Sequence, residues 1–158
     1  VNLTSMVSGG SRRGIRTSGT IVAVRPDSGI IERCPECRRV LRDDACAEHG
    51  PQRGEEDLRL RFVIDDGVSN ASLLMSKDVS EAFLGVDQES VKEQISKEGR
   101  DGFVALLRQR VLAQRLSIKG RSIVDDQGAM LLADEAEQNQ ISPAEAANQV
   151  MQRWGVVL

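Results

Sequence analysis

Five segments of the chain show the apolar patterns expected of β-strands. The first is a β-branched run, and the second alternates between apolar and charged residues with the period of a half-buried strand. An Asp-Asp-Gly sequence at 65–67 separates the second segment from the third, and glycine in a tight turn predicts a hairpin there. The expected strands cover residues 16–24, 58–64, 68–75, 116–124 and 129–133.

Helical spacing replaces this alternation between the third and fourth expected strands. Ser76 or Asp78 can cap a short helix that ends near Gly85, and Asp87 can cap a second helix. Apolar residues at helical spacing continue as far as Val111. We therefore expect three strands, a helical segment and two further strands.

The two ends of the chain differ from this central part. Residues 1–13 contain a Ser-Gly-Gly-Ser sequence and two arginines, and we expect them to form a flexible arm. A Ser-Pro-Ala-Glu sequence at 142–145 has the form of a capping box and predicts an amphipathic helix over residues 142–155. This helix can fold back onto its own domain or pack with helices of partner subunits, and its single tryptophan slightly favours an interface. The apolar stripe consists of Ala147, Val150, Met151 and Trp154.

Composition is that of a globular protein, and the charge is unevenly distributed. The chain has 158 residues, of which 40% are hydrophobic and 28% charged, with a net charge of -3. No apolar run approaches the ~18 residues of a membrane span, so we expect no membrane partner. Residues 12–42 contain eight arginines and three acids, whereas residues 62–158 contain ten basic residues and fifteen acids. This asymmetry indicates an anionic partner on one side; a solvated arginine-rich surface is the alternative.

All three cysteines and the one histidine of the chain lie within sixteen residues. Their spacing is C-x2-C-x8-C-x2-H, so two short knuckles each offer a pair of ligands, and tetrahedral zinc takes such S and N ligands. The alternatives are free thiols beside an unrelated histidine, or a disulfide scaffold, which three cysteines cannot complete. A closed ligand set leaves no position for a substrate, so we expect a structural zinc, and reduced thiols favour the cytoplasm. The expected ligands are Cys34, Cys37, Cys46 and His49.

Five strands with a helix between the third and fourth have the element order of an OB fold, and the cysteines then fall between the first two strands. On its motifs the chain resembles the zinc-containing OB domain of archaeal replication protein A. The resemblance covers about residues 14–135. The motifs are Ser-Gly-Ile-Ile-Glu-Arg-Cys-Pro-Glu-Cys (28–37), Arg-Val-Leu (39–41), Cys-Ala-Glu-His-Gly (46–50), Glu-Asp-Leu-Arg (56–59), Asp-Asp-Gly (65–67), Leu-Gly (84–85) and the strand pair at 115–133.

The expected fold is therefore mainly β: a five-stranded OB-fold barrel over 14–135, with a zinc loop at 30–57, the helical segment and a C-terminal helix. The resemblance implies a subunit of the single-stranded-DNA-binding complex that acts in replication, repair and recombination. The expected partners are single-stranded DNA and, through the C-terminal helix, other subunits of that complex. No small-molecule substrate is expected.

The chain departs from the family pattern in two ways. Arg38 stands where the first knuckle is expected to have a glycine, at a position where positive φ is expected. Single-strand binders stack bases on aromatic rings, but this chain has no tyrosine, and Phe62, Phe83 and Phe103 lie at apolar positions typical of a core. DNA contact must therefore depend on basic side chains. The candidates are Arg33, Arg38, Arg39, Arg42, Arg59, Arg61, Lys119 and Arg121.

Three other functions compete with direct DNA binding. The domain can be an assembly subunit whose partners carry the aromatic residues. Paired carboxylates at 65–66 and 125–126 could hold magnesium in an enzyme, but acids beside a turn glycine more commonly shape the turn, and no nucleophile or phosphate-binding loop accompanies them. We therefore expect no catalysis. RNA-binding zinc-containing OB modules also fit, because no residue pattern here excludes recognition of the 2′-hydroxyl.

Overall fold

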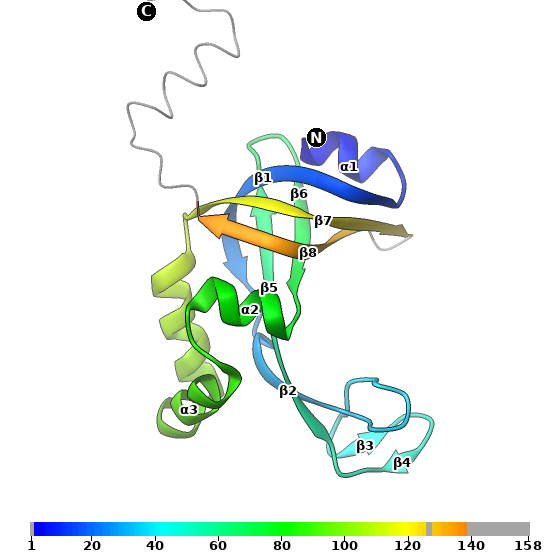
Figure 1. Cartoon of the computed structure of the whole chain (residues 1–158), viewed down its shortest axis with the longest axis vertical. Coiled ribbons are helices and arrows are strands. Elements are labelled where there is room, and N and C mark those ends of the chain that lie inside the picture. The colour runs from blue at the N-terminus through cyan, green and yellow to red at the C-terminus, as the bar shows by residue number, and fades with distance from the viewer. Residues whose placement is uncertain (1, 126–127, 139–158) are drawn as a thin grey trace, which may run out of the picture.

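Five strands form a near-closed ring at the centre of the molecule, seen in a computed structural model that describes residues 2–125 and 128–138 (Figure 1). Around the ring, β1 pairs with β5, β5 with β6, β6 with β8, β8 with β7, and β7 with β1; only the β6–β8 pair is parallel. Thr20 lies opposite both Asp65 and Arg115, so β1 changes partner within its own length. This arrangement resembles an OB fold. The strands are β1 (Arg12–Val24), β5 (Glu55–Asp65), β6 (Asn70–Met75), β7 (Arg115–Asp125) and β8 (Gly128–Gln138).

The inward side chains of these strands fill the ring. On β5 every second residue, from Leu58 to Ile64, is completely buried, and Arg59 and Arg61 alternate with them on the outer surface. The expected half-buried strand is thereby confirmed. Gly120 is on an inward position of β7 where an added Cβ would lie 2.1 Å from the carbonyl oxygen of Leu132, so only glycine allows β7 and β8 to approach this closely.

The Cys/His loop projects from one side of the ring (Figure 1). Strand β2 (Gly29–Arg33) pairs with the first half of β5, and this two-stranded extension carries the loop beyond the ring. Within the loop, the short strands β3 (Ala45–Cys46) and β4 (Gly50–Pro51) pair with each other. The loop therefore lies between the first two strands of the ring, as the sequence predicts.

Two helices connect β6 to β7. Helix α2 (Lys77–Leu84) follows Ser76 and ends at Gly85, which has the left-handed conformation that commonly terminates helices. Helix α3 (Gln88–Val111) starts at Asp87, whose side chain accepts a hydrogen bond from the backbone N–H of Ser90. Both starts agree with the sequence. Gly99 interrupts α3 with a φ of 77°, a break that is not predicted from the sequence.

The N-terminal segment differs from the expected flexible arm. Residues Leu3–Ser8 form helix α1, and β1 already begins at Arg12. Leu3 and Met6 have no exposed surface and belong to the main core. The physical reason is the spacing of these two apolar residues, one helical turn apart, which lets both face the end of the ring. The expectation of a flexible arm over residues 1–13 is therefore corrected for the described part of that segment.

The expected C-terminal helix at 142–155 lies outside the described residues, so it remains a prediction. Within residues 2–125 and 128–138, neither α2 nor α3 has a stretch long and apolar enough to cross a lipid bilayer.

Candidate metal centre and nucleic-acid groove

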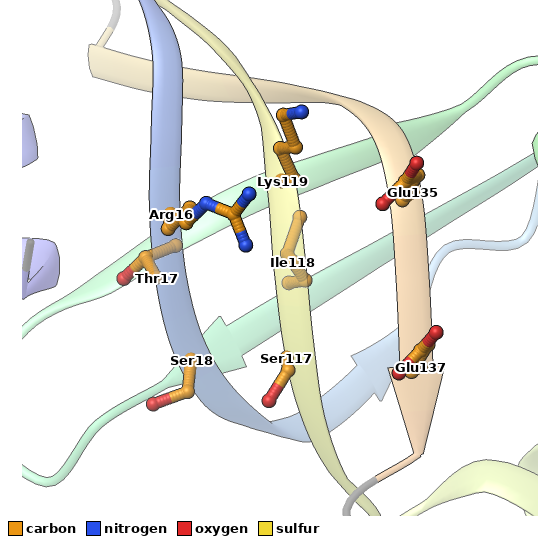
Figure 2. Close-up of a pocket in the computed structure, with 8 residues that line it drawn as sticks. All are labelled: Arg16, Thr17, Ser18, Ser117, Ile118, Lys119, Glu135 and Glu137. Atoms are coloured by element: carbon orange, nitrogen blue, oxygen red, sulfur yellow. The ribbon is translucent and has the colours of Figure 1, made fainter.

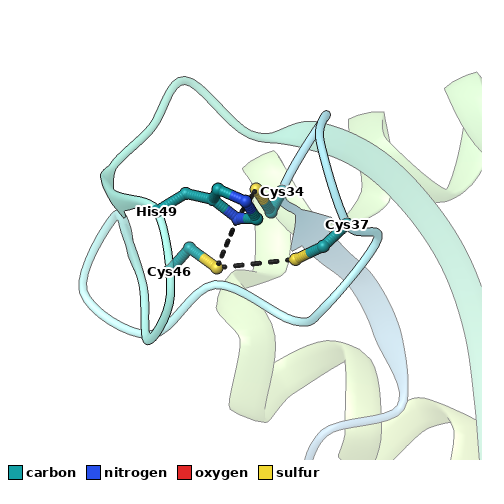
Figure 3. A group of neighbouring side chains, drawn as sticks. All are labelled: Cys34, Cys37, Cys46 and His49. Atoms are coloured by element: carbon teal, nitrogen blue, oxygen red, sulfur yellow. Dashed lines mark hydrogen bonds between the residues drawn. The ribbon is translucent and has the colours of Figure 1, made fainter.

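The three cysteines and the histidine converge at the centre of the projecting loop (Figure 3). Their ligand atoms all lie within 4.8 Å of one another. The Cys37 and Cys46 sulfurs are 3.6 Å apart, and His49 Nδ1 lies 3.6 Å from Cys34 Sγ and 3.5 Å from Cys46 Sγ. A tetrahedral zinc with Zn–S of about 2.3 Å and Zn–N of about 2.0 Å separates two sulfurs by about 3.8 Å and S from N by about 3.5 Å. The residues therefore fit a zinc ion in both ligand type and spacing.

Backbone geometry explains how the first knuckle turns and how the chain returns to the second. The backbone N–H of Arg38 donates to the Cys34 carbonyl, and the N–H of Cys34 donates to the Arg39 carbonyl. Arg38 has a φ of 64°, as expected for a residue in the place of a knuckle glycine. Between the knuckles, Asp43 and Asp44 both have positive φ and form a two-residue turn closed by hydrogen bonds between Arg42 and Ala45. Asp tolerates this conformation better than most residues.

Neighbouring groups lower the pKa of one cysteine and orient the histidine. The backbone N–H groups of Glu48 and His49 hydrogen-bond to the Cys46 sulfur and lower the pKa of that thiol to about 6, which favours the thiolate that binds zinc. On the other side of the imidazole ring, His49 Nε2 lies 3.3 Å from Glu36 Oε2. A carboxylate in this position fixes the ring orientation and leaves Nδ1 to bind the ion. This role of Glu36 is not predicted from the sequence.

A groove runs across the outer surfaces of β5, β6, β8 and β7. Its floor is formed by Leu74 and Leu132, which lie opposite each other on β6 and β8. On the neighbouring strands Arg61 lies opposite Leu74, and Arg121 lies opposite Leu132. This lateral row therefore places two apolar residues between two arginines. We call this feature the strand groove; the residues that line it include Arg33, Asp57, Arg59, Leu74, Arg121 and Leu132.

A second hollow lies between the Cys/His loop and α3. Arg59 lines both this hollow and the strand groove, so the two adjoin each other at Arg59. Arg100 of α3, absent from the sequence candidates, also faces it. We call it the loop hollow; its lining includes Asp27, Val40, Arg42, Arg59, Arg61 and Arg100.

Most of the predicted DNA-binding arginines pair with nearby carboxylates. Arg33 is 2.6 Å from Asp57 Oδ2, and Arg59 and Arg61 both contact Asp27, at 2.9 and 2.7 Å. On the loop, Arg38 pairs with Glu55 and Arg39 with Glu48. Within residues 2–125 and 128–138, Arg42, Lys119 and Arg121 make no ion pair. The loop thus carries less uncompensated positive charge than its sequence suggests.

Lys119 is separated from the other candidates. It lies opposite Arg16 of β1 and Glu135 of β8, in a shallow polar hollow on the outside of β1, β7 and β8 (Figure 2). The glutamates of that surface, Glu135 and Glu137, balance the two basic residues. The structure therefore brings Arg33, Arg59 and Arg121 together in one groove and leaves Lys119 outside it.

The phenylalanines occupy the core, as the sequence predicts. Phe62 is completely buried and Phe103 is 4% exposed. Phe83 packs against the same core, with its ring 6.0 Å from that of Phe62. No aromatic side chain of the described residues therefore lies in the strand groove.

The Asp65-Asp66 pair shapes its turn. Asp65 Oδ1 accepts from the N–H of Gly67, and Asp66 Oδ1 accepts from the N–H groups of Val68 and Ser69. Asp66 Oδ2 also accepts from the N–H of Leu3, which fixes α1 to the turn. These carboxylates are used in the way expected of turn acids. Asp126, in the second pair, lies outside the described residues.

Neither the groove floor nor Arg100 is predicted from the sequence. Leu74 and Leu132 are apolar residues on strands, and no local pattern distinguishes an outward leucine in a groove from a core residue. Arg100 belongs to a charged helix, and its position near β5 depends on how α3 packs.

No protein-family model matches the chain, and no curated protein matches it. Among solved structures, yeast replication protein A bound to single-stranded DNA superposes with a TM-score of 0.59 at 14% identity, covering 98% of this chain and 96% of that chain. A replication protein A heterotrimer bound to single-stranded DNA gives a TM-score of 0.56 at 13% identity, covering 88% of this chain. The chain spans only 34% of the length of that matched chain. The similarity is one of fold alone: the near-closed ring of strands resembles the fold of replication protein A bound to single-stranded DNA.

Proposed function

We propose that this chain is a single-stranded-DNA-binding protein of the replication protein A type, with a structural zinc, acting in DNA replication, repair and recombination. Its zinc-loop motifs favour the archaeal branch of that family, and its reduced thiols favour the cytoplasm. The observation that carries the proposal is the strand groove, in which arginines flank an apolar floor on a fold like that of DNA-bound replication protein A.

The groove offers contacts for both parts of a nucleotide. Guanidinium groups pair with phosphate oxygens through parallel hydrogen bonds and also stack on the faces of bases. Leu74 and Leu132 provide an aliphatic surface between Arg61 and Arg121, on which a base can pack. A stacked aromatic ring contributes about 1–3 kcal/mol per base, and this contribution is missing here. We therefore expect weak, strongly salt-dependent binding.

The zinc would be bound by Cys34, Cys37, Cys46 and His49 and would act as a cross-link. The loop has only a small apolar cluster of its own, formed by Leu41 with the cysteines. Metal binding in such sites supplies folding free energy on the order of 10 kcal/mol. The folded loop holds Arg42 and Val40 beside Arg59 in the loop hollow. The ion would therefore stabilise the binding surface without contacting DNA itself.

The test is an oligonucleotide titration of Arg59→Ala combined with Arg61→Ala. We expect weaker binding of labelled poly-dT and a salt slope smaller by up to about 1.4, because each lost phosphate contact on a single strand contributes about 0.7. The control removes two equal charges that line neither the strand groove nor the loop hollow, with Lys97→Ala and Arg108→Ala on the exposed side of α3. Wild-type protein that binds no oligonucleotide at low salt contradicts the proposal. Matched RNA, titrated in parallel, tests the alternative of an RNA-binding module.

A second candidate function is that of an assembly subunit with little DNA contact of its own. The observations that favour it are the buried phenylalanines and the four carboxylates that already pair with five of the eight candidate basic residues. In that case the stripe of Ala147, Val150, Met151 and Trp154 would pack with other replication protein A subunits. Co-purification with such a subunit that is lost in Met151→Asp or Trp154→Asp would support assembly. A protein that stays monomeric and binds poly-dT alone would favour direct contact.

A further inference from the structure

One carboxylate, that of Asp27, contacts two arginines of the proposed binding surface. Arg59 Nη2 and Arg61 Nη1 donate to the same oxygen, Asp27 Oδ2, at 2.9 and 2.7 Å. The ion pairs of Arg33, Arg38 and Arg39 each involve a separate carboxylate. Two guanidinium groups that converge on one acidic oxygen form the arrangement that binds a phosphate oxygen.

The position of Asp27 is fixed by the turn between β1 and β2. The N–H of Ser28 donates to the carbonyl of Arg25, which closes this turn. The Ser28 hydroxyl donates to the carbonyl of Arg61 and accepts from the N–H of Arg61, and the N–H of Arg25 donates to the same carbonyl. These bonds attach the turn to β5 at the residue whose side chain Asp27 contacts. The carboxylate is therefore held beside the two arginines by the backbone.

The carboxylate is more exposed than either of the arginines that it contacts. The side chain of Asp27 is 41% exposed, compared with 14% for Arg59 and 29% for Arg61. Arg59 Nε is buried and has no hydrogen-bond partner within the described residues. Asp27 can therefore move into solvent while the two guanidinium groups stay in place.

We propose that in the free protein Asp27 occupies the place that a DNA phosphate takes on Arg59 and Arg61, so that binding requires its displacement. This inference rests on the proposed function for the identity of its ligand. A phosphodiester carries one negative charge and two terminal oxygens, as the carboxylate does, so it can replace Asp27, of which both arginines contact the single oxygen Oδ2. Once displaced, Asp27 faces solvent beside the bound strand, where its charge repels the phosphates. Asp27 thereby lowers affinity and favours strands that can engage the groove at several points.

The experiment compares Asp27→Asn with wild-type protein in poly-dT titrations at several salt concentrations. We expect binding about two- to fivefold tighter, the range of one partly exposed ion pair. The salt slope should also be steeper, because wild-type Asp27 takes up a cation when DNA displaces it and the amide does not. Thermal unfolding of both proteins checks that the turn is intact.

The matched control is Asp44→Asn. Asp44 also lines the loop hollow but makes no ion pair within the described residues, and its positive φ is one that asparagine tolerates. An equal gain in both variants would mean that only the overall charge matters, and it would overturn the displacement mechanism. Unchanged or weaker binding by Asp27→Asn would overturn it as well, since it would mean that Asp27 does not compete or that it holds the arginines in position.

Two further arms separate this inference from the proposed function. In the background of Arg59→Ala with Arg61→Ala, Asp27→Asn should have no more effect than Asp44→Asn; a retained gain contradicts the mechanism. Inorganic tripolyphosphate then serves as a phosphate probe without bases. Tighter tripolyphosphate binding by Asp27→Asn, without any poly-dT binding, would reject the DNA function and keep the phosphate site. Equal tripolyphosphate binding by both proteins would reject the site.

Discussion

Replacement of Leu3 by alanine tests whether α1 is a structural part of the domain. Leu3 has no exposed surface, and α1 contacts β1, β6 and β8 at one end of the ring. Truncation of a fully buried leucine costs about 2–5 kcal/mol. Because α1 lies near the start of the described chain and can separate as a unit, we expect the lower part of this range, about 2–3 kcal/mol.

The assay is thermal unfolding followed by circular dichroism, with zinc in excess so that metal loss does not contribute. A loss of about 2–3 kcal/mol lowers Tm by about 6–12 °C in a domain of this size. Adding Met6→Ala should cost less than the first truncation, since both side chains stabilise the same docked helix.

The control is Ser5→Ala, on the exposed side of the same helix. This substitution keeps the backbone bond from Ser5 N–H to the Asn2 side chain. Should Leu3→Ala unfold at the same temperature as Ser5→Ala, α1 would contribute nothing to the fold, and the flexible arm expected from the sequence would be the better description.

Two other predictions concern single carboxylates. Glu36→Gln should weaken zinc binding about tenfold, the lower end of the range for residues that orient a ligand, as measured by competition with a coloured chelator. The control is Glu48→Gln, which removes a carboxylate that contacts Arg39 instead of His49 and should leave zinc affinity unchanged. Equal zinc affinities of the two variants would reject the role of Glu36. Burial raises the pKa of Asp66, but hydrogen bonds from the N–H groups of Ser69, Val68 and Leu3 lower it more, so its folded-state pKa lies below the usual 3.8. The ionised Asp66 carboxylate therefore stabilises the fold fully above the usual pKa of 3.8, and this stabilisation is lost as the pH falls through the folded-state pKa. Asp66→Asn should reduce the decline of the unfolding free energy in acid. A decline as steep as that of wild-type protein would contradict this.

The sequence predicts the local structure well because local signals decide it. Alternation along β5 fixes which side chains face the core, and Asp87 marks the start of α3 with a capping side chain. Arg38 adopts the positive φ expected of a residue in place of a knuckle glycine. The spacing of the cysteines and His49 predicts a cluster, which the loop forms.

Long-range relations are less accessible from the sequence. The contact of Asp27 with Arg59 and Arg61 spans more than thirty residues and depends on the attachment of the turn to β5. The burial of Leu3 depends on the open end of the ring, which exists only after all five strands have paired. The sequence pattern does not show which carboxylate pairs with which arginine. The sequence therefore predicts more uncompensated positive charge around the arginines than the structure shows.

The pairing of the strands also determines where another chain could add a strand. Within the described residues, every strand of the ring pairs with two neighbours along part of its length. The Cys/His loop covers the outer edge of β2 at Glu32 and Arg33, where the N–H of Leu41 donates to the Glu32 carbonyl and Val40 bridges to Arg33. Unpaired strand edges are templates for aggregation. If the loop unfolds without its metal, β2 becomes such an edge. Metal loss would then cause self-association as well as local unfolding, and the ion would protect the solubility of the protein.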